Sequence, residues 1–261
     1  MHVLLVGLGN MGKKYLSKLE DMGEKLLLCD KDPSKDTGKH SFYCHFGDIN
    51  EELKAAIIAI EPSMHVEVAQ KFLKKGCHVL LEKPPALSSH EFEKIYDYPN
   101  LYVSEIETFS SCIKYFPKDF KEIRIERLGS GRGYISPLWD LAWHDFYMLQ
   151  LFSEDISIES FKKDKVLELE GRADGIKFSL RVAWEHLNPS RKWFIDGGEL
   201  VLDFAKEEVW REGKLIFQGK RDKLKMMLEN FLRGEYDTKS KERAMKNIKL
   251  LEDIQGLLTS S

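Results

Sequence analysis

The sequence predicts an α/β protein in two parts: a Rossmann domain with a doubly wound parallel sheet, followed by an α+β domain with a mostly antiparallel sheet. Two observations predict the first part. A glycine triplet lies between an apolar run and a helical pattern, and strand-like and helix-like segments alternate after it up to residue 104. A third observation predicts the second part, because short alternating segments bounded by glycine occupy residues 166–218.

The first thirty residues are typical of a strand, a glycine turn, a helix and a second strand that ends in an acid. Gly7, Gly9 and Gly12 follow the first apolar run at G-x-G-x-x-G spacing, and Asp30 comes eighteen positions after Gly12. Gly7 permits a tight turn, Gly9 lets a pyrophosphate approach bare backbone, and Gly12 lets the helix pack closely against the strand. In this context the triplet is a dinucleotide-binding fingerprint.

NAD is the expected cofactor. Its phosphates should lie at the helix N-terminus, where unpaired N–H groups and the helix dipole stabilise them. The Asp30 carboxylate would accept hydrogen bonds from the ribose hydroxyls and repel a 2′-phosphate, which favours NAD over NADP. Lys31 meets either solvent or a cofactor phosphate, so NADP stays an alternative. The cofactor-binding residues expected here are Gly7, Gly9, Asn10, Met11, Gly12, Asp30 and Lys31.

Strands and helices alternate along the rest of the first half. The strand-like segments are residues 41–44, 55–60, 77–81 and 101–104, and the helix-like segments are residues 49–53, 61–76 and 88–96. Such alternation builds a parallel sheet, and functional groups collect where its strands end. Glu82, Lys83 and Pro84 lie at one of these ends. We expect this first domain to span residues 1–120.

The second domain is expected over residues 121–261. A strand over residues 123–128 and a helix over residues 137–152 open it, and helices over residues 222–232 and 240–258 close it. The strand-like segments between them are residues 166–169, 176–186, 192–195, 200–204, 208–211 and 215–218. Their alternation of apolar and polar residues is typical of antiparallel strands.

Composition narrows the class of protein. The 261 residues are 43% hydrophobic and 32% charged, with a formal net charge of -3, which gives no sign of a nucleic-acid partner. The apolar runs are too short to span a membrane and no signal peptide opens the chain, so we expect a cytoplasmic protein without a membrane partner. Abundant Lys and Glu with few Asn and Gln is a balance found in proteins from hot environments.

The cysteines and the other metal-binding residue types predict no metal site. The four cysteines form no CxxC pair and are expected to be reduced core thiols: Cys29, Cys44, Cys77 and Cys112. No set of His, Cys, Asp and Glu has the spacing of a zinc site.

Lys83 is the first candidate for chemistry. It lies between a strand end and two prolines, which restrict the backbone around it. An ammonium there can hydrogen-bond a substrate oxygen and favour the alkoxide-like charge that develops during hydride transfer. The alternative is an exposed lysine in a turn, which is the commoner state of lysine.

Asp140 and His144 are the second candidate, within SPLWDLAWHDFYMLQLF. Ser136 and Pro137 suit the first positions of a helix, and a spacing of four places Asp140 and His144 on one face of it. A carboxylate so near can orient the imidazole and raise its pKa, so that it accepts a proton near neutrality. The alternative is a histidine that packs among Trp139 and other aromatic residues.

Three motifs in order resemble the glucose-fructose oxidoreductase / inositol dehydrogenase / rhizopine catabolism (Gfo/Idh/MocA) family of NAD(P)-dependent oxidoreductases. They are VGLGNMG, EPSMHVEVAQKFLKKGCHVLLEKPPALS and WDLAWHD. The residues that match the family's motifs are His65, Glu82, Lys83, Pro84, Asp140 and His144. By this resemblance Lys83 would bind the reacting oxygen near the nicotinamide, His144 would exchange the proton, and Asp140 would orient the substrate or the imidazole. His65, Glu82 and Lys83 then join the expected cofactor-binding residues, although His65 could instead simply close its turn.

The resemblance implies an NAD(P)-dependent dehydrogenase or reductase that transfers a hydride between a nicotinamide cofactor and the hydroxyl or carbonyl group of a sugar, polyol or related small molecule. It also implies a homo-oligomer that assembles through the C-terminal sheet. The chain is short for the family, so we expect a reduced sheet or trimmed loops in the second domain. Two alternatives stay open: a cofactor-binding regulatory protein without turnover, and a reductase of imines or tetrapyrrole-like substrates.

Overall fold

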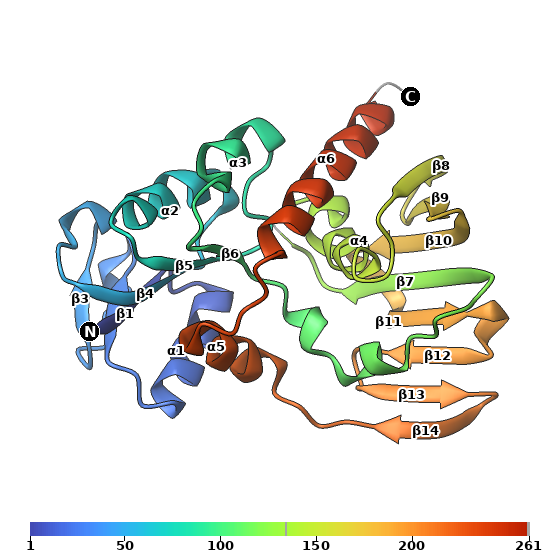
Figure 1. Ribbon diagram of the computed structural model, residues 1–261, viewed down its shortest axis with the longest axis horizontal. Helices are drawn as coiled ribbons and strands as arrows, with labels where there is room; N and C mark the ends of the chain where they lie inside the picture. The colour runs from blue at the N-terminus through green and yellow to red at the C-terminus, as the bar shows by residue number, and fades with distance from the viewer. Residues whose placement is uncertain (134, 260–261) are drawn as a thin grey trace. The chain divides into compact units, whose positions relative to one another are not determined.

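The computed structural model describes residues 1–133 and 135–259 (Figure 1). Contacts divide the chain into two compact units, which we call the N-terminal and C-terminal units. The N-terminal unit comprises Met1–Glu105 and Leu224–Ile248, and the C-terminal unit comprises Ile106–Lys223 and the residues from Lys249 onward. The chain therefore returns to the N-terminal unit near its end. The division of domains at residue 120 stays a prediction.

The N-terminal unit has the predicted parallel α/β architecture. Within its described residues, six strands form one parallel sheet in the order β3-β2-β1-β4-β5-β6. The strands are β1 (His2–Val6), β2 (Leu26–Cys29), β3 (Ser41–Tyr43), β4 (Leu53–Ile58), β5 (His78–Leu81) and β6 (Leu101–Val103). The order reverses between β1 and β4, and ligands bind at such a switch point in open α/β sheets.

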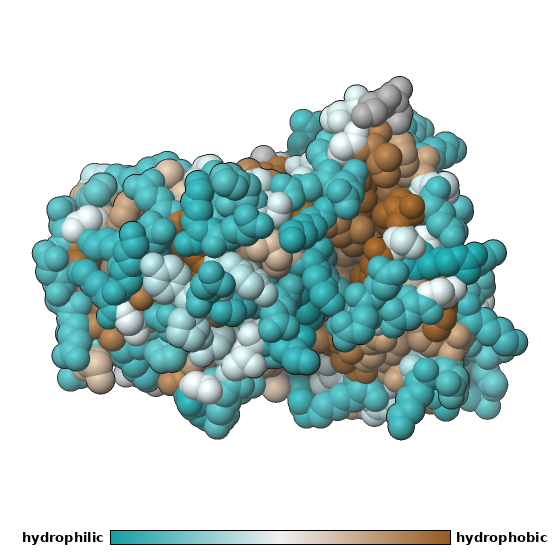
Figure 2. All heavy atoms as spheres, turned by 45° about the horizontal axis from the view of Figure 1, so that its top comes forward, coloured by the Kyte–Doolittle hydropathy of each residue, from teal (hydrophilic) through white to brown (hydrophobic). Residues whose placement is uncertain are grey.

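Helices cover both faces of this sheet. They are α1 (Asn10–Asp21), α2 (His65–Lys74), α3 (Ser89–Tyr96) and α5 (Lys223–Arg233). Helices α2 and α3 lie on one face, and α1 and α5 lie on the other (Figure 1). Hydrophilic side chains dominate the face of this unit that Figure 2 shows.

Continuous apolar runs explain the core of this unit. The β1 and β4 side chains are buried from Val3 to Val6 and from Ala55 to Ile58, as expected for strands covered on both faces. On α1 the buried side chains are Tyr15 and Leu19, whereas Leu16 is only partly covered.

The helix predicted over residues 49–53 is wrong. A short 3₁₀ turn, Phe46–Asp48, precedes β4, and β4 already begins at Leu53. The Nδ1 atom of His45 accepts a hydrogen bond from Gly47 N at 3.0 Å, and Lys71 Nζ donates to Gly47 O at 2.6 Å. Because Lys71 lies on α2, this turn depends on a contact that local sequence does not specify.

The C-terminal unit contains the predicted, mostly antiparallel sheet. In its described part, eight strands form the order β14-β13-β12-β11-β7-β10-β9-β8. Strands β7 and β10 run parallel, and the other neighbours run antiparallel. The strands are β7 (Glu122–Ser130), β8 (Ile156–Lys163), β9 (Leu167–Ala173), β10 (Ile176–Ala183), β11 (Glu185–Ile195), β12 (Leu200–Asp203), β13 (Glu208–Arg211) and β14 (Lys214–Gln218).

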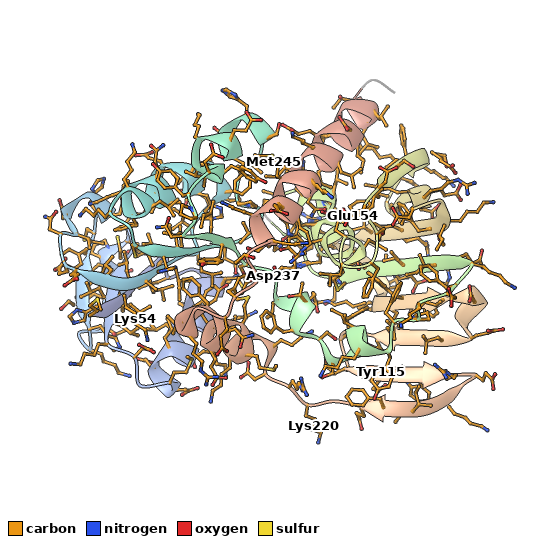
Figure 3. All side chains as sticks on the ribbon, viewed as in Figure 1. Lys54, Tyr115, Glu154, Lys220, Asp237 and Met245 are labelled. Atoms are coloured by element: carbon orange, nitrogen blue, oxygen red, sulfur yellow. The ribbon has the colours of Figure 1, made fainter. Side chains whose placement is uncertain are left out.

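Two further helices complete the chain. Helix α4 (Trp143–Leu149) belongs to the C-terminal unit, and α6 (Ser240–Thr259) continues from one unit into the other. Side chains fill the layers between the strands and helices of each unit (Figure 3). Among the described helices, none is both long and apolar enough to cross a membrane.

Candidate functional site

The glycine loop between β1 and α1 has the geometry that a phosphate requires. Gly7 has a φ of +93°, and a Cβ atom there would lie 2.3 Å from Ala59 O. A Cβ atom on Gly12 would lie 1.9 Å from Gly7 O. Gly9 differs, because no described atom beyond its chain neighbours lies within 4 Å of the Cβ it would carry. Gly7 and Gly12 therefore close the turn, and Gly9 presents open backbone.

The N-terminus of α1 suits an anion. Gly9 is the N-cap residue, and within the described residues no side chain caps the helix there. Gly9 and Asn10 are exposed and Met11 is partly exposed. The first N–H groups of a helix have no partner within it, and the dipole places positive charge at this end. These residues fit the pyrophosphate of a dinucleotide.

Asp30 lies at the end of β2, directly beside the glycine loop. Its Oδ2 atom accepts a hydrogen bond from Leu8 N at 2.7 Å, and its Oδ1 atom accepts one from Asp32 N at 3.0 Å. Lys35 Nζ lies 3.0 Å from Oδ1 and 2.9 Å from Oδ2. Burial opposes ionisation of this carboxyl, but the two backbone N–H groups and Lys35 outweigh it and lower the pKa of Asp30.

Lys31 forms an ion pair away from the Asp30 carboxylate. Its Nζ atom lies 3.0 Å from Oε1 of Glu61, in the segment after β4. The Lys31 side chain is 82% exposed, so the pair contributes little to stability. The structure thus places Lys31 at the surface, near the end of β2.

His65 joins the segments that follow β4 and β5. Its side chain is completely buried, with Nδ1 2.9 Å from Pro84 O and Nε2 3.1 Å from Ile60 O. Burial lowers the pKa of His65 to about 4, although the two carbonyl groups favour the protonated ring. This geometry closes the turn, one of the two roles expected for His65.

Glu82 fixes the backbone of Lys83. Its Oε2 atom accepts a hydrogen bond from Lys83 N at 3.0 Å, and its Oε1 atom accepts one from Ser104 Oγ at 3.0 Å. Oε1 also accepts a hydrogen bond from the phenol of Tyr15 on α1. Burial and the nearby Glu82 carboxylate raise the pKa of Tyr15, so the phenol stays protonated and donates.

Lys83 itself is partly exposed, whereas Glu82, Pro84 and Pro85 on either side of it are buried. The Lys83–Pro84 peptide bond is cis. Buried neighbours and the hydrogen bond to Lys83 N therefore hold the backbone of Lys83 in place at the carboxyl edge of the sheet.

Asp140 and His144 belong to the C-terminal unit, whereas Lys83 belongs to the N-terminal unit. Of the described residues from Leu138 to Leu149, these two alone are partly exposed and the others are buried. A π-helical turn, Leu138–Ala142, precedes α4, and Ser136 Oγ accepts a hydrogen bond from Trp139 N at 3.4 Å. The predicted helix therefore exists with a π-helical first turn, a feature frequent at functional sites.

A buried ionic network adjoins His144. Asp145 accepts hydrogen bonds from Arg127 Nε at 2.6 Å and Nη2 at 3.2 Å, and from Trp193 Nε1 at 2.8 Å. Arg127 Nη1 also lies 3.2 Å from Oε1 of Glu107. Arg127 and Asp145 are nearly inaccessible to solvent, so each neutralises a charge that would be costly alone.

Lys223 extends the network from the other side of Glu107. Its Nζ atom lies 2.7 Å from Glu107 Oε2 and 3.0 Å from Glu207 Oε1. Burial disfavours the charged form of Glu107, but Arg127, Lys223 and His144 outweigh it and lower its pKa to about 2. His144 thus acts electrostatically on Glu107, and its neighbour on α4, Asp145, belongs to the same network.

Several of these residues were not found by sequence reasoning. Five of them belong to no sequence motif: Tyr15, Lys35, Glu107, Arg127 and Lys223. A signal existed for Arg127, because it shares the inward face of β7 with Ile123 and Ile125 and breaks their apolar pattern. Tyr15 contacts Glu82, 67 residues away, and Lys223 contacts Glu107, 116 residues away, so no local pattern predicts these two contacts.

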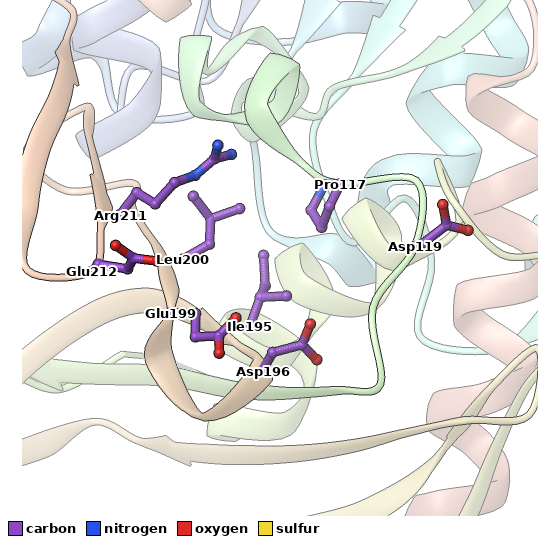
Figure 4. Close-up of a pocket in the computed structure, with 8 residues that line it drawn as sticks. All are labelled: Pro117, Asp119, Ile195, Asp196, Glu199, Leu200, Arg211 and Glu212. Carbon is purple, nitrogen blue, oxygen red and sulfur yellow. The ribbon is translucent and has the colours of Figure 1, made fainter.

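A cavity of about 270 Å³ lies elsewhere in the C-terminal unit (Figure 4). It is lined by Pro117, Asp119, Ile195, Asp196, Glu199, Leu200, Arg211 and Glu212. Asp196 Oδ1 accepts hydrogen bonds from Lys121 N at 2.7 Å and Glu122 N at 3.2 Å, so this carboxylate holds the start of β7. None of the predicted site residues lines the cavity. Over the described residues, no group of His, Cys, Asp and Glu side chains is arranged to hold a metal ion.

Comparison with protein families gives one match over the first part of the chain. Residues 1–100 match the model of an oxidoreductase family with an NAD-binding Rossmann fold. The matched range contains the glycine loop, Asp30, His65, Glu82 and Lys83. The match confirms the resemblance that the sequence motifs indicated.

Solved structures with the same fold extend over both units. UDP-N-acetylglucosamine 3-dehydrogenase from Acidithiobacillus ferrooxidans has a TM-score of 0.82 at 18% identity, covering 97% of this chain and 96% of that chain. A myo-inositol dehydrogenase from Corynebacterium glutamicum has a TM-score of 0.76 at 14% identity, covering 97% and 94%. Levoglucosan dehydrogenase, in complex with NADH and levoglucosan, has a TM-score of 0.82 at 14% identity, covering 100% and 98%. The alignments cover nearly all of these three chains, so the second domain is not shortened relative to them as we expected.

Proposed function

We propose, from the premise that this chain belongs to the Gfo/Idh/MocA family of oxidoreductases, that it transfers a hydride between a nicotinamide dinucleotide and a hydroxyl or carbonyl group of a small molecule. One observation carries the proposal. Gly9 presents open backbone at the uncapped N-terminus of α1, in a turn where Gly7 and Gly12 leave no room for a side chain. That combination leaves room for a pyrophosphate at the helix N-terminus, and packing alone does not require the open backbone of Gly9.

The nicotinamide ring, when bound, accepts or supplies the hydride. In the direction of oxidation, the substrate carbon loses a hydride and its hydroxyl loses a proton. We assign the proton to His144, whose partly exposed ring projects from an otherwise buried helix. The Lys83 ammonium would hydrogen-bond the substrate oxygen and stabilise the negative charge that develops on it. Asp140 would orient the substrate or the imidazole.

Sugars, polyols and related cyclic alcohols are the substrate class we favour. The names of the three similar structures state that they act on a nucleotide sugar, on myo-inositol and on levoglucosan. Lysine, histidine and aspartate side chains suit such substrates because each can hydrogen-bond a hydroxyl group.

NAD is the preferred cofactor in this proposal, since the ionised Asp30 carboxylate disfavours a 2′-phosphate. We further propose a homo-oligomer that assembles through the C-terminal sheet. Light scattering on the purified chain tests the assembly, and a monomer at micromolar concentration would contradict it.

The test of the function is turnover with a panel of substrates. The absorbance of the reduced nicotinamide would be followed with NAD and NADP against sugars, polyols, keto acids and imines. Oxidation of a sugar or polyol that disappears in Lys83→Met supports the proposal. Tight cofactor binding without turnover of any substrate would favour a regulatory protein, and turnover of imines alone would favour an imine reductase.

A further inference from the structure

At the end of β2 the Lys35 ammonium is more exposed than the Asp30 carboxylate with which it pairs. The Asp30 side chain is 6% exposed, whereas that of Lys35 is 31% exposed. Lys35 Nζ contacts both oxygens of Asp30, at 3.0 Å and 2.9 Å. A ligand that approaches this point therefore meets the ammonium before the carboxylate.

The local sequence builds this contact. Asp32 accepts hydrogen bonds from Ser34 N at 3.0 Å and Ser34 Oγ at 2.7 Å, and Pro33 occupies the first position of the 3₁₀ turn Pro33–Lys35. Aspartate before proline is a strong signal for such a turn. The turn reverses the chain, so Lys35 returns to the residue five positions before it.

The acceptor capacity of Asp30 is already used. Each carboxylate oxygen carries two contacts, from Leu8 N and Lys35 on Oδ2 and from Asp32 N and Lys35 on Oδ1. A carboxylate offers about four lone-pair sites in all. Two ribose hydroxyls can therefore bind Asp30 only by displacing Lys35, whereas the Lys35 ammonium keeps a third N–H to donate.

We infer that Lys35 is a residue that determines cofactor specificity, because its ammonium neutralises Asp30 and offers a donor to the adenosine ribose or to a 2′-phosphate. This inference rests on the proposed function. It implies that the chain discriminates against NADPH much less than a bare aspartate at this position would. Lys31 has a different role, since it pairs with Glu61.

Dissociation constants for NADH and NADPH, measured by nicotinamide fluorescence, test the inference without any substrate. In Lys35→Met, the ratio of the NADPH constant to the NADH constant should rise about tenfold, equivalent to about 1.4 kcal/mol. Lys35→Arg keeps the charge and should keep the wild-type ratio within about threefold. Lys39→Met removes one charge from an exposed position in the same segment and should leave the ratio unchanged.

The outcomes separate this inference from the proposed function. A ratio in Lys35→Met equal to that of wild type would overturn the inference while leaving the function intact. An equal rise in Lys35→Met and Lys39→Met would also overturn it, because the effect would then be a general loss of charge. Wild-type protein that binds neither cofactor would overturn both. A ratio that rises in Lys35→Met alone, and falls toward wild type in strong salt, supports it.

Discussion

The Nδ1 atom of His65 lies 2.9 Å from the carbonyl oxygen of Pro84, the residue that follows Lys83. The other ring nitrogen lies 3.1 Å from Ile60 O, so one imidazole links the segments after β4 and β5. A neutral imidazole carries one N–H and can donate to only one of these carbonyls. Protonation would satisfy both, yet burial outweighs this gain and lowers the pKa of His65 to about 4.

The free energy of unfolding should therefore decrease as the pH falls from 6.5 to 4. The unfolded histidine has a pKa near 6.5, so the unfolded state takes up a proton at a higher pH than the folded state does. The contribution of neutral His65 is complete above about pH 6.5 and is lost as the pH falls toward 4, on the order of 3 kcal/mol. Urea unfolding at several pH values measures it.

Two variants isolate the contribution of His65. His65→Gln should be less stable at neutral pH and should lose most of the dependence on pH between about 6.5 and 4.5. His90→Gln changes an exposed histidine on α3 and should keep it. If His65→Gln retains the wild-type slope, another group titrates in this range and the assignment is wrong.

Gly9→Val should abolish NADH binding and leave the fold intact. The position is open in the structure, so a branched side chain costs only about 1 kcal/mol at the helix N-cap, but it fills the space that the pyrophosphate needs. Gly7→Val is the contrast, because its Cβ would collide with Ala59 O at a φ of +93° and the chain should unfold. Circular dichroism and an NADH fluorescence titration measure the two effects. Normal NADH affinity in a folded Gly9→Val protein would show that the pyrophosphate does not bind at Gly9.

The parallel sheet could be predicted because its signals are local. Glycine spacing marks the turn after β1, and uninterrupted apolar runs such as Ala55–Ile58 mark strands covered on both faces. The prediction of a helix over residues 49–53 was wrong because the structure there depends on a contact from elsewhere in the chain. Lys71 on α2 helps to hold this segment in a different turn. Local patterns do not contain such a contact.

The residues of the candidate site likewise include some that the sequence could predict and others that it could not. Gly9, Lys83 and His144 could be singled out from motifs and spacing. Their supports could not, because Tyr15 reaches Glu82 across sixty-seven residues. The contact of Lys35 with Asp30 depends on the local turn at Asp32 and Pro33, but the sequence does not single it out, because a lysine in a polar turn is usually exposed to solvent.

Loss of Arg127 should be strongly destabilising. Arg127→Met leaves the buried carboxylates of Asp145 and Glu107 without their main partner, which costs about 3 to 5 kcal/mol. Arg124→Met, on the exposed face of the same strand, should cost less than about 1 kcal/mol. Urea unfolding at neutral pH compares the two, and similar losses would show that the buried network does not stabilise this unit.

Arg127→Met should also weaken the dependence of stability on pH in acid. The pKa of Glu107 is lowered to about 2 in the folded protein, so its contribution is present above its ordinary pKa near 4.5 and is lost as the pH falls toward 2. Arg127 is the charge that lowers the pKa of Glu107 most, so this pKa should rise when Arg127 is removed. The free energy of unfolding of Arg127→Met should therefore decrease less than that of the wild-type protein as the pH falls from about 4.5 to 2. Urea unfolding at several pH values in this range measures the two slopes, and equal slopes would contradict the prediction.

Lys83→Met and His144→Asn should slow the chemical step and leave cofactor affinity nearly unchanged. Lys83 is placed to stabilise charge on the substrate oxygen, and His144 to exchange the proton. Removal of either group should lower kcat/KM by roughly 10² to 10⁴. Steady-state kinetics with the substrate found in the panel, together with an NADH titration, measures both quantities. Lys94→Met and His90→Asn remove the same residue types at exposed positions on α3 and should have wild-type rates.

A purely structural role for His144 makes a different prediction, because activity would then follow the folded fraction. His144→Asn should instead stay folded at the assay temperature, since its side chain is one of only two partly exposed ones in the described segment Leu138–Leu149. It should also lose one limb of the pH dependence of kcat/KM, which a change in stability alone would not remove. Asp140→Asn should change this limb less than His144→Asn does, because it acts through orientation rather than proton transfer. If folded His144→Asn turns over at a near-normal rate across the pH range, the histidine carries no proton and the assignment fails.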